Sequence, residues 1–298
     1  MAIQLTPAGE YGRHVRVTVG PVAGGDAKTW SSDSMQSVAP DIPPSLVNGV
    51  RISFDLKRDA ASEPSQGSVK IYNLSASSRA WLQAEGLQVG IEAGYGETLR
   101  SLFSGDIADV WHEKQGVDWV STIEAGDGEA SYRDARIMFS GAPGISRRRV
   151  FDELARSLGV PTGYIASVAE TSYRTGVTLA GSARQYLDEL CEELDLRWSI
   201  QDGALQVIES AGATADEAFV VSASSGLIGR SSLRRADNGT AGVRFKVRLN
   251  GLLNPGRAVV LEDGDNTGTY VVEKVSHKGD SGSGGDYATE VEATEARR

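Results

Sequence analysis

The chain has 298 residues and a formal net charge of −10, with 40% hydrophobic and 23% charged residues. This composition is typical of a soluble globular protein. The length suggests two domains or three small ones. The acidity argues against a protein that grips nucleic acid by its phosphates, because such binding needs a basic surface. The single cysteine, Cys191, excludes an intrachain disulfide.

No segment approaches the roughly 18 consecutive apolar residues of a membrane span. The first residues also lack a basic region followed by an apolar run, which a secretory signal would show. We therefore expect no membrane insertion, and a chain that is made and assembled in the cytosol.

The first 130 residues alternate between apolar and polar side chains, which predicts half-buried antiparallel strands. Ile52, Phe54 and Leu56, for example, share one side. The other alternating sets are Val15/Val17/Val19, Val69/Ile71, Val89/Ile91/Ala93 and Val117/Trp119/Ser121/Ile123. Glycine-rich turns separate them, so the region is typical of a sandwich or barrel. We expect the polar insertion 31–44 to be a loop that reaches a neighbouring subunit.

The middle of the chain changes to helical spacing. One helix is predicted over 146–158, ended by Gly159, and a second over 182–194. Ser182 and Gln185 have the spacing of a capping box. Apolar runs at 197–200 and 205–208, joined at Asp202-Gly203, predict a hairpin. These elements predict a small α+β module, followed by an acidic linker at 211–218.

Strands return in the last part of the chain. Val243, Phe245 and Val247 point one way, and a basic stripe of Arg244, Lys246 and Arg248 points the other. Further strands are predicted over 258–261, 270–275 and 287–293, with a polar hairpin tip at 279–286. We thus predict a mainly β protein with a small α+β module. The predicted domains are 1–130 and 219–298, both β, on either side of 131–218.

The reactive residues give weak leads only. His112-Glu113 begins like a zinc-protease motif, but Gly116 stands where the second histidine belongs. Three histidines, His14, His112 and His277, with one cysteine make a zinc cluster improbable. The run from Asp263 to Gly268 starts like a calcium loop, but Lys274 replaces the closing glutamate. We expect a turn there.

No carboxylate pair with lysozyme-type placement and no nucleophile, phosphate or dinucleotide motif stands out. The sequence therefore predicts no catalytic, cofactor-binding or metal-binding residue and no cofactor. Cys191 is expected to be a buried thiol, and Arg147–Arg149 an exposed helix start. Trp119 and Trp198 alternate with apolar neighbours and are expected in the core.

Three groups of segments, in this order, resemble the phage tail hub family of the late-control-D and tail-hub type. The first resembles that family's N-terminal barrel, and it comprises 67–75, 89–95 and 102–107. The second resembles the middle domain, from 124–128 through the helix ending at Gly159 to 182–190 and 198–203. The third comprises 226–229, 249–256, 268–277 and 287–293. Each is common strand-and-turn sequence, and the order and spacing carry the resemblance.

The resemblance implies a structural protein without enzymatic activity. In such hubs each subunit supplies two tube-type β-barrels that flank the middle domain. A homotrimer then presents six similar barrels, so that a hexameric tail tube docks on one side and a trimeric spike or tail tip on the other. The implied location is the tail baseplate of a virion, with the tape-measure protein as a further candidate partner. DNA would pass through the lumen without specific binding, so we expect a neutral or acidic lining.

Other functions stay open at this point. A tube protein or distal tail adaptor is the nearest alternative, although the middle module argues against a single-barrel tube. A tail-tip cell-wall hydrolase would need a reactive constellation in a cleft. A carbohydrate-binding tail module is suggested by the five tryptophans, Trp30, Trp81, Trp111, Trp119 and Trp198.

Overall fold

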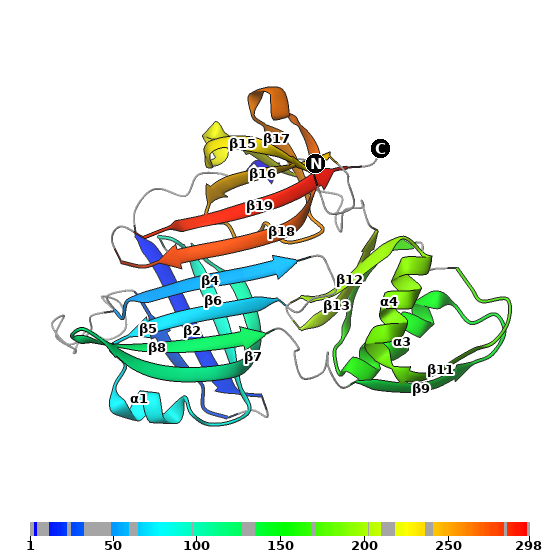
Figure 1. The fold of residues 1–298 in the computed structure, drawn as a ribbon, viewed down its shortest axis with the longest axis horizontal. Coiled ribbons are helices and arrows are strands. Elements are labelled where there is room, and N and C mark those ends of the chain that lie inside the picture. The colour runs from blue at the N-terminus through cyan, green and yellow to red at the C-terminus, as the bar shows by residue number, and fades with distance from the viewer. Residues whose placement is uncertain are drawn as a thin grey trace.

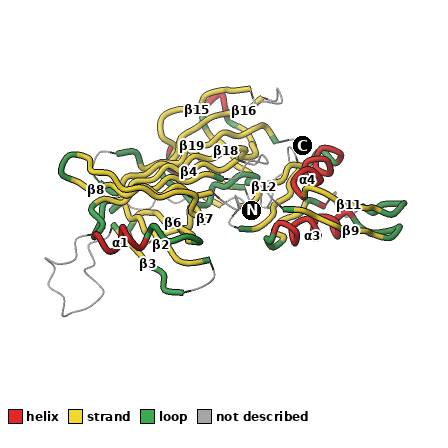
Figure 2. The backbone as a smooth tube through the Cα atoms, turned by 60° about the horizontal axis from the view of Figure 1, so that its bottom comes forward, coloured by secondary structure: helices red, strands yellow, loops and turns green. Residues whose placement is uncertain are grey.

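The computed structural model describes residues 3–4, 12–22, 25–32, 49–59, 65–96, 98–126, 135–167, 171–201, 203–209, 218–235, 241–282 and 285–296. The fold is mainly β with few helices, as the sequence predicts. Two β units lie side by side, and a helix-containing module lies at one end (Figure 1). The backbone trace also shows the two longer helices gathered at that end (Figure 2). Within the described ranges, no helix is both long and apolar enough to cross a membrane.

The N-terminal β unit is built on the predicted alternation. Successive side chains of a strand point to opposite faces, and the apolar set of each strand is buried in one core that includes Val17, Ile52 and Leu56. Val117 differs from prediction, because it lies in a hairpin turn and is 91% exposed. The elements are β2 (Arg13–Pro21), β3 (Lys28–Ser31), β4 (Ile52–Asp59), β5 (Gln66–Tyr72), α1 (Ala76–Trp81), β6 (Leu87–Tyr95), β7 (Thr98–Gln115) and β8 (Asp118–Gly126).

The middle module packs two amphipathic helices on short sheets. The first helix is capped by Ser146 and ends at Gly159, whose φ of +74° suits glycine. Before the second, Ser182 accepts a hydrogen bond from the Gln185 amide, while the Gln185 side chain bonds Glu189. Only half of the predicted capping box therefore forms. The elements are β9 (Arg136–Gly141), α3 (Arg147–Leu158), β10 (Thr162–Ile165), β11 (Val177–Ser182), α4 (Ala183–Glu193), β12 (Leu196–Gln201) and β13 (Ala204–Glu209).

The C-terminal β unit has its own core, centred on alternating residues such as Val243, Phe245 and Val291. The short strand β1 (Ile3–Gln4) also joins it by pairing with its first strand. The elements are β14 (Phe219–Ser222), the 3-10 turn η3 (Ala223–Ser225), β15 (Leu227–Arg235), β16 (Ala241–Arg248), β17 (Ala258–Glu262), the 3-10 turn η4 (Gly264–Asn266), β18 (Gly268–Asp280) and β19 (Tyr287–Glu295).

The two β units share one strand order. In the N-terminal unit the strands run β4-β5-β8-β7-β6, and in the C-terminal unit they run β15-β16-β19-β18-β17. In both units the hairpin made by the fourth and third strands of that order has one irregularity, at Ala108 and at Glu273. The chain therefore contains the same β arrangement twice.

One strand pairing joins the two units, and we call it the seam. Residues Lys274–Asp280 of β18 pair antiparallel with Ser53–Asp59 of β4, which merges both units into one 14-stranded sheet. Tyr287 of β19 reaches into the N-terminal core, where its hydroxyl lies 2.7 Å from the carbonyls of His14 and Gly94. The seam thus combines backbone pairing with a buried anchor.

Two predicted segments, the 31–44 loop and the 211–218 linker, lie almost wholly outside the described residues. The described residues form three separate hydrophobic cores, one in each β unit and one in the middle module. The boundaries predicted at 130/131 and 218/219 stay predictions.

Candidate functional surface

The described residues contain no cluster of three or more His, Cys, Asp and Glu side chains that could hold a metal ion. His112 instead bonds Ser121 through Nδ1 at 3.0 Å, and its Nε2 lies 3.0 Å from the carbonyl of Arg79. His112 therefore has the contacts of a structural side chain.

Cys191 lies in the buried face of α4. Burial raises the pKa of its thiol to about 12, and the nearby Asp188 carboxylate acts in the same direction. Because the thiolate is the reactive form, this thiol is inert near neutral pH.

The predicted turn at Asp263 forms as the 3-10 turn η4 between β17 and β18. The carboxylate accepts hydrogen bonds from the amide and the hydroxyl of Ser231, both at 2.6 Å. These two bonds lower the pKa of Asp263. The carboxylate ties β15 to the turn, which gives it a structural role.

The structure tests two predictions about exposure, one for the basic residues at the start of α3 and one for the two tryptophans expected in the core. Arg147 begins α3 as predicted, but it is ion-paired with Glu193, and Arg149 pairs with Glu153. Trp198 is buried as predicted. The prediction for Trp119 is wrong, because the residue is 38% exposed and the Arg79 guanidinium lies over its ring, 4.3 Å from the ring centroid.

The most distinctive surface is the outward face of four neighbouring strands around the seam. Its charges alternate in sign from strand to strand: Arg244 and Lys246 on β16, Glu290 and Glu292 on β19, Lys274 and Lys278 on β18, and Asp55 and Asp59 on β4. We call these eight residues the charged face. Four of the eight are basic and four are acidic, and Lys57, on the same side of β4 between the two aspartates, adds a further positive charge.

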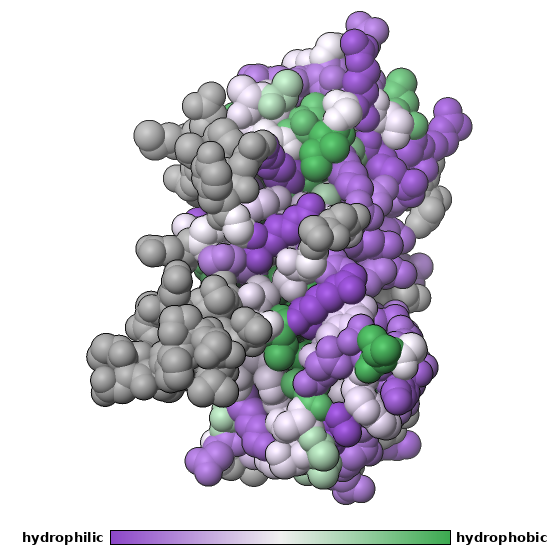
Figure 3. Space-filling view, turned by 90° about the vertical axis from the view of Figure 1, so that its left-hand side faces the viewer, coloured by the Kyte–Doolittle hydropathy of each residue, from purple (hydrophilic) through white to green (hydrophobic). Residues whose placement is uncertain are grey.

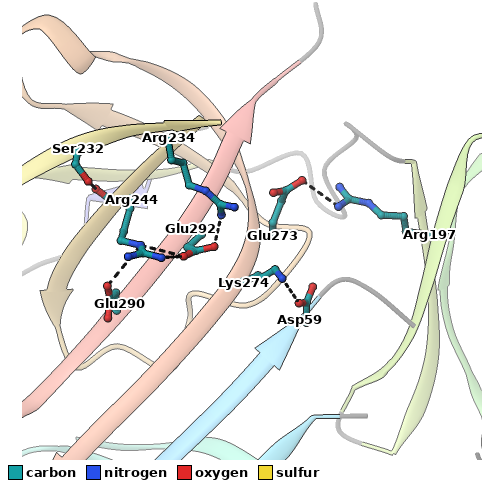
Figure 4. A network of polar contacts seen from close by, with 9 residues as sticks. All are labelled: Asp59, Arg197, Ser232, Arg234, Arg244, Glu273, Lys274, Glu290 and Glu292. Atoms are coloured by element: carbon teal, nitrogen blue, oxygen red, sulfur yellow. Dashed lines mark hydrogen bonds and ion pairs between the residues drawn. The ribbon is translucent and has the colours of Figure 1, made fainter. Parts of the chain in front are cut away.

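Ion pairs between strands hold the charged face in place (Figure 4). Arg234 and Arg244 converge on Glu292, with Arg244 Nε 2.9 Å from the carboxylate. Across the seam, Lys274 bonds Asp59 at 2.9 Å and Lys278 bonds Asp55 at 3.1 Å. Pairs as exposed as these contribute about 0–1 kcal/mol each. Their main effect is to neutralise the face.

Two hollows lie on this side of the sheet, and both are lined by charged and polar side chains. One extends over the charged face, and the other lies over β4, β5 and β8, with Lys57 and Gln66 lining both. The end of the molecule at the left of Figure 1 is also largely hydrophilic, with separate small hydrophobic spots (Figure 3). The arrangement suits contact with water or a polar partner.

Beneath the seam lies a buried polar cluster that the sequence analysis missed. His277 has no exposed surface, and its Nδ1 is 2.9 Å from the hydroxyl of Thr289. Burial, reinforced by the Arg58 guanidinium, lowers the pKa of His277 to about 3. Arg58 bonds the Asn254 side chain at 3.0 Å. The histidine is therefore neutral near pH 7, and the Arg58–Asn254 bond joins the two units.

A second buried contact joins the middle module to the C-terminal unit. Arg197 of β12 bonds Glu273, the irregular position of β18, at 3.1 Å (Figure 4). The Glu273 side chain is 8% exposed, so the pair is largely desolvated. No local pattern could reveal this pair, because its members are 76 residues apart.

Comparison with solved structures identifies this fold. A search of family models and a search of curated proteins found no match. The 43 kDa tail protein of prophage MuSo2 from Shewanella oneidensis has a TM-score of 0.64 at 8% identity, over 94% of this chain and 96% of that one. A tail protein from Neisseria meningitidis MC58 gives 0.64 at 12% identity, over 96% and 97%.

A third structure, the Escherichia coli c3393 protein, gives a TM-score of 0.57 at 10% identity, over 84% of this chain and 74% of that one. It is described as a component of the type VI secretion system with structural similarity to the T4 tail proteins gp27 and gp5. The similarity thus extends over nearly the whole chain. The chain has the fold of phage tail proteins, in agreement with the resemblance drawn from its sequence.

Proposed function

We propose that the chain is the structural hub of the baseplate in a phage or phage-like tail. It forms a homotrimeric ring that joins a hexameric tail tube to a trimeric spike or tail tip. The shared fold supports a tail role, and the repeated β arrangement supports the hub in particular.

The repeat is the observation that carries the proposal. A hub must match sixfold symmetry on one side and threefold symmetry on the other. Two similar β units in each chain give six similar units in a trimer, while the single middle module occurs only three times. Such a ring needs repeated contacts between copies and no reactive group.

The charged face is proposed to line the channel of this ring. Proteins bind DNA phosphates mainly through an excess of Lys and Arg side chains. This binding releases the counterions that surround the DNA. The eight residues of the face carry equal numbers of both signs, tied together in ion pairs, and Lys57 beside them adds one positive charge, so the attraction for DNA is far weaker than that of a basic surface. DNA, and with it a tape-measure protein, would pass without being held. The virion tail is the corresponding location, after assembly in the host cytoplasm.

The mass of the purified protein in solution tests the proposal. Light scattering after size exclusion should give a trimer of the 31.6 kDa chain, alone at high concentration or with tube and spike proteins. A chain that stays a monomer even with those partners would contradict the hub.

Activity tests separate the alternative functions. A peptidoglycan zymogram should show no clearing, and a glycan array should show no binding. Clearing that survives repurification would favour a hydrolase.

A further inference from the structure

The two β units can be aligned residue by residue. The β7–β8 hairpin and the β18–β19 hairpin each have a single irregular position, and these two positions serve as the reference point. Alignment of Ala108 with Glu273 places β7 on β18 and β8 on β19. His112 then matches His277, and Ser121 matches Thr289. Each histidine bonds its matched hydroxyl through Nδ1, at 3.0 Å and 2.9 Å. The same histidine–hydroxyl contact thus occurs at matching places.

The first strand of each unit matches as well. Pairing through β5 and β16 places β4 on β15, so that Leu56, Lys57 and Arg58 correspond to Leu233, Arg234 and Arg235. The two strands therefore carry Leu-Lys-Arg and Leu-Arg-Arg at equivalent positions. In the seam, Leu56 lies opposite His277 and both side chains are fully buried.

The matching residues outside the seam lie at open edges. Within the described part of the chain, no strand pairs with the outer edge of β7 at Val110–Glu113 or with that of β15 at Ser232–Arg235. Leu233, the counterpart of the buried Leu56, is 75% exposed. An open strand edge presents backbone N–H and C=O groups to which another strand can pair, and such a pairing would cover the exposed Leu233 side chain.

Side chains occupy backbone groups at the β7 edge. The Val110 amide donates to Asp109 Oδ1 at 2.8 Å, and the Gln83 amide donates to the Val110 carbonyl at 3.2 Å. Val275, the counterpart of Val110, pairs there with Arg58 of β4. Gln83 lies in the connection between the second and fifth strands of its unit, as does Asn254, which bonds Arg58 in the seam. A pairing strand would bring Arg235 to Gln83 in the same way.

We propose that the β7 edge of one copy pairs antiparallel with the β15 edge of the next copy and so repeats the seam between subunits. This inference rests on the proposed trimer and names its contact. The register follows from the repeat: Val110 opposite Arg235, Trp111 opposite Arg234, His112 opposite Leu233, and Glu113 opposite Ser232. Leu233 then becomes buried beside His112.

The charges favour this partner over others. In the seam, the basic Lys274 and Lys278 of β18 face acidic residues of β4. At the open edges the signs are reversed, since β7 carries Asp109 and Glu113 whereas β15 carries Arg230, Arg234 and Arg235. Two β7 edges would repel each other, and so would two β15 edges. A head-to-tail contact remains, which can close into a ring.

Disulfide trapping tests the register. Val110 directs its amide and carbonyl to the edge, so Glu113 and Ser232 form a non-hydrogen-bonded pair with Cα atoms about 4.5 Å apart, a distance that a disulfide can span. The full chain carrying E113C and S232C, oxidised at high concentration, should give covalent dimers and trimers that disappear on reduction. No larger species should form.

Matched variants control the result. K278C with D55C occupies the equivalent pair of the seam and must form a disulfide within one chain. E113C with R230C shifts the register and should cross-link poorly, and each single variant shows whether Cys191 takes part. A trimer by mass without the E113C–S232C bond overturns this contact and leaves the hub intact. Equal cross-linking of the shifted pair overturns the register, and a monomer at every concentration overturns both proposals.

Discussion

The seam and the open edges are built from corresponding residues in different surroundings. In the seam, His277 and Leu56 are fully buried, and β18 pairs with β4. At the open edges, His112 is part-exposed and Leu233 is largely exposed. The same strand arrangement and the same histidine contact occur in both. Whether these residues are buried therefore depends on pairing of the strand edge rather than on the fold of the unit itself.

The largest expected difference concerns the two leucines. Leu56→Ala removes a fully buried side chain and should lower the free energy of unfolding by about 2–5 kcal/mol. Leu233→Ala should change the stability of the isolated chain by less than about 0.5 kcal/mol, because its side chain is exposed. Urea unfolding of dilute protein measures both.

The two leucine variants should also differ in their ability to form the trimer. Leu233→Ala should weaken the trimer at high concentration although the chain stays folded. Equal losses of stability for the two variants, or an unaffected trimer, would remove the proposed correspondence.

The next largest effect on stability is expected at the irregular positions of the two hairpins, Glu273 and Ala108. Glu273→Ala leaves Arg197 without its carboxylate and should cost about 2–4 kcal/mol, since the pair is largely buried. Replacing both residues with methionine should restore most of this, because no uncompensated charge remains. Ala108, the counterpart of Glu273, is exposed, so Ala108→Ser should be nearly silent. Thermal unfolding of the four proteins decides whether this pair anchors the middle module.

His277 should make the stability of the folded chain depend on pH. The unfolded chain protonates His277 below about pH 6.5, whereas the folded chain does so only near its lowered pKa of about 3. The unfolded state therefore binds more protons in this window, and His277 makes stability fall as the pH drops through it. The slope reaches about 1.4 kcal/mol per pH unit.

Comparison with His277→Gln isolates this contribution from that of the carboxylates. The wild-type chain should lose stability more steeply than the variant between pH 6 and pH 4. Identical slopes would show that His277 is protonated in the folded state.

The smallest effect belongs to the exposed ion pairs. Lys278→Ala removes the bond to Asp55, and both side chains are nearly half-exposed, so the loss should be about 1 kcal/mol or less and should shrink in high salt. At the open edge, Glu113→Lys should leave the monomer equally stable but reduce trimer formation. A large loss of monomer stability from Lys278→Ala would mean that the charged face holds the units together, and an unchanged trimer in Glu113→Lys would contradict the edge contact.

The sequence predicts those parts of the fold that depend on local periodicity. Alternation located the strands around Val17, Ile52 and Phe245, and helical spacing located α3 and α4. The six-residue helix α1 was missed because it is too short to show a period. Trp119 was misassigned because alternation identifies a face of a strand without telling whether anything covers that face.

The candidate surface depends on partners far apart in sequence. β18 and β4 are separated by some 200 residues, and nothing local indicates that they pair. The repeat is also hidden, since Lys274 and Lys278 correspond to Asp109 and Glu113. Leu-Lys-Arg beside Leu-Arg-Arg, and the two histidines with their hydroxyl partners, keep a common signature. These similarities can be recognised as a repeat once the strand pairing shows which residues correspond.

Electron microscopy of the assembled ring tests the proposed hub most directly. We expect three copies that present six similar β units around a channel, with each β7 edge paired to a neighbouring β15 edge and the charged face on the channel wall. A closed ring in which those edges face solvent, or one whose channel is lined by an excess of Arg and Lys, would contradict it.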